Sequence, residues 1–287
     1  MSASPPLRTS AALEEFADPP RVVARFVHPG RQPFVQRAGV DARAAAPFAA
    51  LLAGIDEPAL AAYEAGFAAD IDRSAALIDP VHASRLPFVA GDRILALGDS
   101  ITDDSLSWAF QLQAYLARHR AADGIHVINA GITGNTTQEA LARIDRIAAE
   151  RPTWVIQMLG TNDARRHGRI GARMQSLEET RRNLRLLAEL IATETDAEHV
   201  CLTPPPVVEA DADAWAPFRD ERITWREADV AEIADAVRAH PGRVVDVHAR
   251  LRDAPAGWLL PDGVHPTLVG QRRIADIVLD ALSAPPH

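Results

Sequence analysis

Apolar and polar residues from position 93 onward follow two alternating patterns. Short runs rich in Val, Ile and Leu are typical of buried strands, and longer stretches with apolar residues every three or four positions are typical of helices. The predicted strands are 93–97, 126–129, 154–159, 199–202 and 244–247. The predicted helices are 105–120, 137–150, 175–193, 223–239 and 267–282. Because strands and helices alternate, we expect an α/β fold, a three-layer α/β/α sandwich around a five-stranded parallel sheet.

The first 88 residues do not continue this alternation. Two short apolar runs around a Pro-Gly pair predict a β-hairpin, and two Ala-rich stretches that follow predict helices. The hairpin strands are expected at 22–27 and 34–36, and the helices at 42–54 and 57–78. We therefore divide the chain into an N-terminal accessory region, 1–88, and an α/β domain, 89–287. The pattern leaves open whether the accessory region is a separate domain, a lid or an oligomer contact.

Composition narrows the classes of function. All 30 basic residues are arginine, and the absence of lysine excludes a lysine Schiff base and the Walker A phosphate loop. The 39 acidic residues give a net charge of −9, which opposes binding to nucleic acid or to an anionic membrane surface. We therefore expect a small-molecule substrate and no nucleic-acid partner.

Cysteine usage and hydropathy bear on location. Cys201 is the single cysteine, so an intramolecular disulfide and a Cys-rich zinc site are excluded, and we interpret it as a small core residue. The sequence has no run of 18 apolar residues and no basic start followed by an apolar segment. We expect a cytoplasmic protein without integral membrane association. The Ala-rich accessory region makes homo-oligomerisation through that region a further hypothesis.

Ser100 occupies a position suited to nucleophilic chemistry. The first predicted strand runs into Gly98-Asp99-Ser100, and a helix follows. A hydroxyl at this turn projects from the carboxyl edge of the sheet, where ligands of parallel sheets bind, and the helix amino terminus offers N–H groups to a developing oxyanion. Helix capping by Ser100 or Thr102 is the simpler alternative.

Further polar residues follow the next two strands. The second strand ends near Gly131 and the third near Asn162. The Gly131 N–H, the Asn162 side-chain amide and the Ser100 N–H together would supply three donors to an oxyanion. Turn chemistry alone explains either motif equally well when each is taken in isolation.

A histidine and an aspartate precede the last predicted helix. Asp262 and His265 are three residues apart, with Gly263 between them, so a turn can fold the carboxylate back onto His265 Nδ1. Nε2 would then accept the proton of the Ser100 hydroxyl, as in a catalytic triad. A lone histidine near a helix start is more often a surface residue, but here it accompanies the serine, glycine and asparagine at the same sheet edge.

These motifs together resemble the SGNH/GDSL hydrolase family over roughly residues 90 to 285. The matching blocks, in order, are Gly98-Asp99-Ser100, Gly131, Gly160-Thr161-Asn162-Asp163 and Asp262-Gly263-Val264-His265. The resemblance implies a flavodoxin-like fold with Ser100 as nucleophile, and His265 and Asp262 as the rest of the triad. It also implies an oxyanion hole formed by Ser100, Gly131 and Asn162. The accessory region is outside the family's common core.

We therefore predict a serine esterase that forms an acyl-enzyme and acts on a small-molecule, glycosyl or lipid ester. An acyltransferase with the same triad, or a binding protein that keeps only the fold, are the alternatives. No cofactor is expected, and no metal site, because the acidic residues near Ser100 match no ligand spacing. Further candidates for contact with the substrate are Ile101, Asn135, Asp163, Trp215, Phe218 and Val264.

Overall fold

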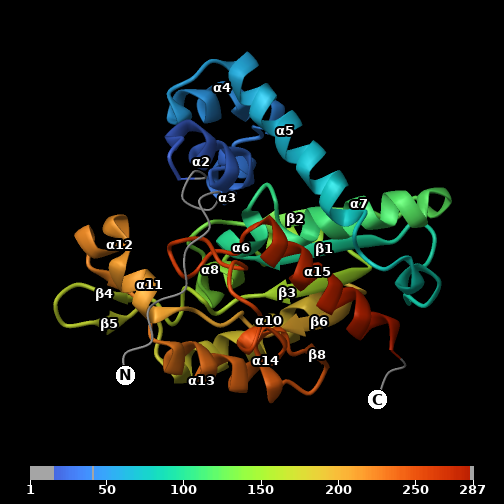
Figure 1. Cartoon of the computed structure of the whole chain (residues 1–287). Coiled ribbons are helices and arrows are strands. Elements are labelled where there is room, and N and C mark those ends of the chain that lie inside the picture. Colours follow the sequence, from blue (N-terminus) through green and yellow to red (C-terminus); the bar gives the residue numbers. More distant parts are fainter. Residues whose placement is uncertain (1–15, 41, 285–287) are drawn as a thin grey trace.

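A parallel five-stranded sheet forms the centre of the computed structural model, which describes residues 16–40 and 42–284 (Figure 1). The strands, in their order across the sheet, are β2 (His126–Gly131), β1 (Arg93–Gly98), β3 (Trp154–Met158), β6 (Glu198–Leu202) and β8 (Arg243–Val245). All four pairings are parallel. The predicted α/β class and five-stranded parallel sheet are confirmed. Strand order reverses at β1, and open α/β sheets usually bind their ligands beyond the carboxyl ends of the strands at such a point, here β1 and β3.

Helices cover both faces of the sheet, because the central strand β1 is apolar on both sides. Ile94 and Ala96 face a core that includes residues of two long helices, and Leu95 and Leu97 face a second core that includes residues of three others. The first pair is α7 (Trp108–His119) and α15 (Leu268–Ser283), and the other three are α8 (Thr137–Leu141), α9 (Ile144–Ala149) and α10 (Leu177–Glu194). Helix α13 (Glu227–Arg238) packs against α10. The result is the expected three-layer sandwich.

The region before the sheet is helical, so the predicted hairpin is wrong. Its helices are α2 (Pro19–Phe26), η1 (Pro29–Arg31), α3 (Pro33–Arg37), α4 (Ala42–Ala53), α5 (Glu57–Ala75) and η2 (Pro80–Ser84). Asp18 caps α2 by accepting from the Arg21 N–H, and two prolines occupy its first turn, where their missing N–H groups cost nothing. These signals outweigh the β propensity of its valines. Figure 1 shows α2, α3 and α4 gathered beyond the sheet, with α5 leading back to it.

Several predicted boundaries also change. The first two residues of the predicted helix 223–239 form β7 (Ile223–Thr224), which joins β4 (Arg166–His167) and β5 (Ala172–Arg173) in a small antiparallel sheet. The predicted helix 137–150 is divided into α8 and α9, because Arg143 turns inward and donates to the carbonyls of Ala130 and Gly98. The remaining elements are α6 (Ser100–Asp103), η3 (Ala121–Asp123), α11 (Glu209–Ala214), α12 (Ala216–Asp220) and α14 (Val247–Arg252).

A search of the described residues for a membrane span finds no single helix that is both long and apolar enough. Two consecutive helical segments, Ala44–Ala53 and Glu57–Ala75, pass the test of length and composition only together, across a bend of 93°.

Candidate active site

Ser100 is the first residue of α6, directly after the carboxyl end of β1. Asp99 caps this helix, because its side chain accepts from the Ile101 N–H at 3.0 Å. The Ser100 hydroxyl therefore does not serve as the cap, and the simpler interpretation of this serine does not hold. The Ser100 Oγ lies 2.9 Å from His265 Nε2, and Ser100 is 6% exposed.

The loop before α15 holds Asp262 against His265. One Asp262 oxygen accepts the backbone N–H groups of Val264 and His265, both at 2.9 Å, and the other lies 2.7 Å from His265 Nδ1. A carboxylate only accepts, so Nδ1 carries the proton and Nε2 is free to accept from Ser100. Gly263 has a φ of +69°, a left-handed conformation that glycine adopts without strain and that folds the loop back. Folding thus produces a continuous Ser100–His265–Asp262 chain.

The surroundings shift the pKa values of His265 and Asp262 in opposite directions. Burial alone would lower the pKa of His265, but the charge of Asp262 and the hydrogen bond to it raise this pKa above its usual value. Burial alone would raise the pKa of Asp262, but the charge of His265 and the bonds to its oxygens hold this pKa below its usual range. Asp262 is therefore ionised beside an imidazole whose protonated form is stabilised.

Asp99 is a third ionisable residue, next to Ser100 in the sequence. It is 1% exposed, and burial raises the pKa of Asp99 to about 7, against the lowering effects of the Ile101 N–H and of the charge of His265. A buried carboxyl that ionises near neutral pH is a common feature of functional sites.

Two predicted oxyanion donors are available, and the third is not. The Ser100 N–H has no acceptor among the residues that the structure describes. The Asn162 amide donates one hydrogen to the Asn135 carbonyl at 3.1 Å and has a second to offer. Gly131, however, is buried, and its N–H donates to Asn129 Oδ1 at 2.9 Å. The prediction for Gly131 is therefore wrong: it is a packing glycine, and a Cβ there would lie 2.3 Å from the Asp103 nitrogen.

Gly134, which the sequence reasoning passed over, is better placed than Gly131. It lies in a turn closed by the Asn135 N–H and the Ile132 carbonyl, has a φ of +85° and is half-buried. Within the described part of the chain its N–H has no acceptor. Because Asn135 bonds to Asn162, this turn lies directly beside the Asn162 amide. The signal in the sequence was the second glycine of Gly131-Ile132-Thr133-Gly134.

The N-terminal region is anchored to the residues that follow Ser100. Arg25 and Asp104 form a bidentate ion pair, both contacts 2.7 Å long, with side chains only 1% and 0% exposed. Asp103 is bound by His28 and Arg31 on one side and by Thr133 on the other. These contacts attach a region outside the family's common core to the helix that begins with Ser100.

The same region also reaches His265. The Phe26 ring lies against the His265 ring, with 5.1 Å between the centroids. The Phe26 carbonyl accepts from Thr133 Oγ1 at 2.7 Å, and Arg25 donates to the carbonyl of Pro266, the residue after His265. Phe26 therefore forms part of the surroundings of the Ser–His–Asp chain, which nothing in the sequence pattern indicated.

Three predicted substrate contacts are wrong, because their side chains are enclosed. Ile101 and Val264 are 1% and 2% exposed and belong to two hydrophobic clusters. Asp163 is fully buried, and its carboxylate accepts from the Thr137 N–H and from the hydroxyls of Thr137 and Thr180. It positions the start of α8 and does not face a ligand.

The other predicted contacts have different outcomes. Trp215 and Phe218 are half-buried and pack against the rings of Phe16 and Trp225, and none of these ring contacts involves the Ser–His–Asp chain. Asn135 lies beside Asn162, and its buried Oδ1 has no partner in the described structure. Asn135 therefore remains the predicted contact that the geometry favours most.

Comparisons with known proteins show which family this chain belongs to. Residues 96–273 match the model of the GDSL-like lipase/acylhydrolase family. A thioesterase 1/protease 1/lysophospholipase L1 from Escherichia coli K12 is 33% identical over 96 residues, which cover 33% of this chain and 44% of that protein. An acetylxylan esterase from Geobacillus stearothermophilus is 32% identical over 89 residues, 26% of this chain and 41% of that protein. The chain thus spans less than half the length of these curated relatives.

Solved structures show the same fold. An alpha/beta hydrolase enzyme from the metagenome of Lake Arreo, Spain, has a TM-score of 0.55 at 23% identity, covering 68% of this chain and 96% of that one. A catalytic mutant of an acetylxylan esterase from Geobacillus stearothermophilus also has a TM-score of 0.55, at 22% identity, covering 68% and 95%. The family match spans well over half of the sequence, and this chain therefore belongs to the GDSL-like lipase/acylhydrolase family.

Proposed function

We propose that the chain is a serine esterase that hydrolyses carboxylic esters through an acyl-enzyme on Ser100. The observation that carries this proposal is the hydrogen-bonded series from Ser100 Oγ through His265 to Asp262, with contacts of 2.9 and 2.7 Å. Both distances are within the range that direct proton transfer and orientation require. Membership of a family of lipases and acylhydrolases supports the same reaction class.

In the first half of the reaction, Ser100 Oγ attacks the ester carbonyl carbon while His265 Nε2 removes the hydroxyl proton. The tetrahedral intermediate collapses when His265 returns this proton to the leaving alkoxide, which departs as the alcohol. In the second half, water attacks the acyl-enzyme, His265 again takes and returns a proton, and the carboxylic acid leaves. Asp262 remains ionised throughout and stabilises the imidazolium.

The oxyanion would be held by three donors. We assign these to the backbone N–H groups of Ser100 and Gly134 and to the Asn162 side-chain amide. The two N–H groups have no acceptor within the described residues, and the Asn135 carbonyl fixes the orientation of the Asn162 amide. Donors fixed in this way stabilise developing charge without reorganisation.

The surroundings favour a small acyl group. Ser100 is only 6% exposed, and the Phe26 ring lies against His265, so little space is open beside the reacting atoms. The curated relatives are named for a thioester and for an acetyl ester of xylan, which suggests acetyl esters and thioesters as the first compounds to test. On this proposal, Phe26→Ala should increase activity on longer acyl chains relative to acetate.

The decisive test compares Ser100→Ala with Ser84→Ala on p-nitrophenyl acetate. Ser84 is exposed on η2, so its variant should match the wild type and control for the substitution itself. Ser100→Ala should lose at least about a thousandfold in kcat, because removing a triad nucleophile leaves only binding and oxyanion stabilisation. Retained activity in Ser100→Ala would exclude the proposal. A serine-directed phosphonate should add one label per chain, at Ser100, and labelling at any other residue would exclude it as well.

A further inference from the structure

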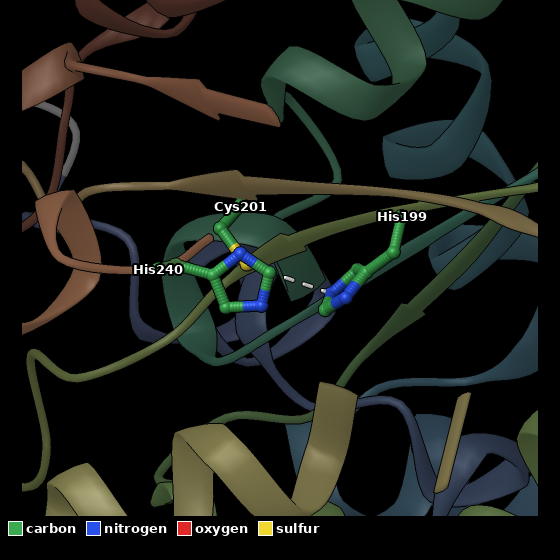
Figure 2. Close-up of side chains that lie close together, drawn as sticks. All are labelled: His199, Cys201 and His240. Carbon is green, nitrogen blue, oxygen red and sulfur yellow. Dashed lines mark hydrogen bonds between the residues drawn. The ribbon is translucent and has the colours of Figure 1, made fainter. Parts of the chain in front are cut away.

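Three residues with metal-binding side chains lie together away from Ser100. His199 and Cys201 are two apart on β6, so their side chains share one face of the sheet, and His240 lies in the turn between α13 and β8 (Figure 2). The cluster is near the amino-terminal end of β8, whereas Ser100 follows the carboxyl end of β1. None of the three residues belongs to the proposed catalytic machinery.

The spacing of the three side chains suits a transition metal ion. Cys201 Sγ lies 3.6 Å from His199 Nε2, and one ligand atom from each residue lies within 4.8 Å of the other two. Zinc bonds of about 2.0 Å to nitrogen and about 2.3 Å to sulfur place the two ligand atoms about 3.5 Å apart in a tetrahedral site. The sulfur and the first imidazole therefore already have the separation that an ion would impose.

The chemistry of the ligands points to a borderline or soft ion. Burial, followed by the charge of His240, lowers the pKa of His199 to about 4, and burial also lowers the pKa of His240, so both imidazoles are neutral at pH 7. Burial raises the pKa of the Cys201 thiol to about 12, so this thiol keeps its proton until an ion displaces it. Imidazole and thiolate select zinc-like ions over magnesium and calcium, which prefer oxygen.

One ring nitrogen of His240, Nε2, lacks a hydrogen-bond partner among the described residues. The Gly242 N–H donates to His240 Nδ1 at 2.9 Å, which places the proton of the neutral ring on Nε2. Nε2 is buried and has no partner among the described residues, and an unsatisfied buried donor is costly. Whichever nitrogen binds an ion, the Gly242 bond is given up, because the ion either takes the Nδ1 lone pair or moves the ring proton to Nδ1.

We propose that His199, Cys201 and His240 bind one zinc-type divalent ion, with water as the fourth ligand. The ion loses bound waters and gains two imidazole nitrogens and the Cys201 thiolate, and the thiol proton passes to the solvent. Both histidines are half-buried, so the cluster lies close to the surface of the protein. Binding would join β6 to the turn before β8 and stabilise this edge of the sheet.

The test uses the full-length chain after treatment with a chelator. Titration with Zn²⁺ in a calorimeter should give one ion per chain, with release of about one proton per ion near neutral pH, because the Cys201 thiol is the group that loses its proton. Mg²⁺ should give no binding. Co²⁺ should produce the near-ultraviolet absorption of a cobalt–thiolate bond. Cys201→Ser should abolish that absorption, and His240→Ala should weaken Zn²⁺ binding at least tenfold. His126→Ala, which alters an exposed histidine on β2, should change neither.

Three results would overturn the proposal. The first is a wild-type chain that binds no Zn²⁺ in the micromolar range. The second is Zn²⁺ binding that inhibits ester hydrolysis and survives the Cys201 and His240 substitutions, which would place the ion at His265. The third is an unchanged Gly242 amide resonance on saturation with Zn²⁺, a measurement on the wild type that holds even if a variant fails to fold.

Discussion

The ion pair between Arg25 and Asp104 should be among the most costly in the chain to break. Both side chains are almost completely buried, and Arg25 also donates to the Pro266 carbonyl. Arg25→Ala would leave the Asp104 carboxylate buried without its cation. Breaking a buried pair in this way costs about 3–5 kcal/mol. Asp104 keeps its bonds to the Leu106 N–H and the Gln271 amide, so we expect the lower end of this range.

The assay is equilibrium unfolding in urea, followed by tryptophan fluorescence. Arg37→Ala is the matched control, because Arg37 also links the N-terminal region to the α/β domain, through Asp145, but in a pair whose side chains are 50% and 55% exposed. Such a surface pair contributes about 0–1 kcal/mol. Adding Asp104→Asn to Arg25→Ala should recover part of the loss, since the unpaired charge is removed. A loss below about 1 kcal/mol for Arg25→Ala would refute the reasoning.

Three further predictions concern the site itself. Asn162→Ala should lower kcat on an aryl ester about a hundred- to a thousandfold, as the loss of an oxyanion donor does in other enzymes. A change below tenfold would show that Asn162 is not an oxyanion donor. kcat/KM should fall as pH drops through the pKa of His265, because only the neutral imidazole accepts the Ser100 proton. This pKa lies above the usual value for histidine, and a flat profile between pH 5 and 8 would contradict the role of His265. Asp99 has a raised pKa, so the stability that its neutral form contributes is present at low pH and lost as pH rises through about 7. Asp99→Asn should therefore remove part of the decline in unfolding free energy between pH 6 and 8, which chemical denaturation at the two pH values measures.

Much of the α/β domain could be predicted because its signals are local. Apolar residues in strand 93–97 and helix 267–282 follow a clear pattern, and both elements occur almost at the predicted bounds. The place of Ser100 at the carboxyl edge of the sheet follows from the rule that ligands of parallel sheets bind there. Its contact with His265 depends on the path of the loop before α15, which only the folded chain determines. The hairpin at 22–27 failed because valines suggested a strand, while the Asp18 cap and two prolines actually set a helix.

The other failures at the site have a common physical cause. Two glycines, Gly131 and Gly134, lie three residues apart, and only the folded backbone determines which N–H is already bonded. Ile101 and Asp163 adjoin catalytic motifs in the sequence but point into the protein. Likewise, no spacing rule brings His240 to Cys201, because tertiary packing alone makes that contact.

The contacts of Asp103 link the N-terminal region to the turn beside Ser100. Its carboxylate contacts His28 and Arg31 in the N-terminal region and Thr133 in the turn that carries Gly134. Substitutions at residues 28 and 31 would therefore alter the position of this turn without changing Ser100, His265 or Asp262 themselves. If the proposed esterase is evolved for higher turnover, residues 16–40 are therefore positions to vary, and trimming the chain to the part that matches the family would discard these contacts.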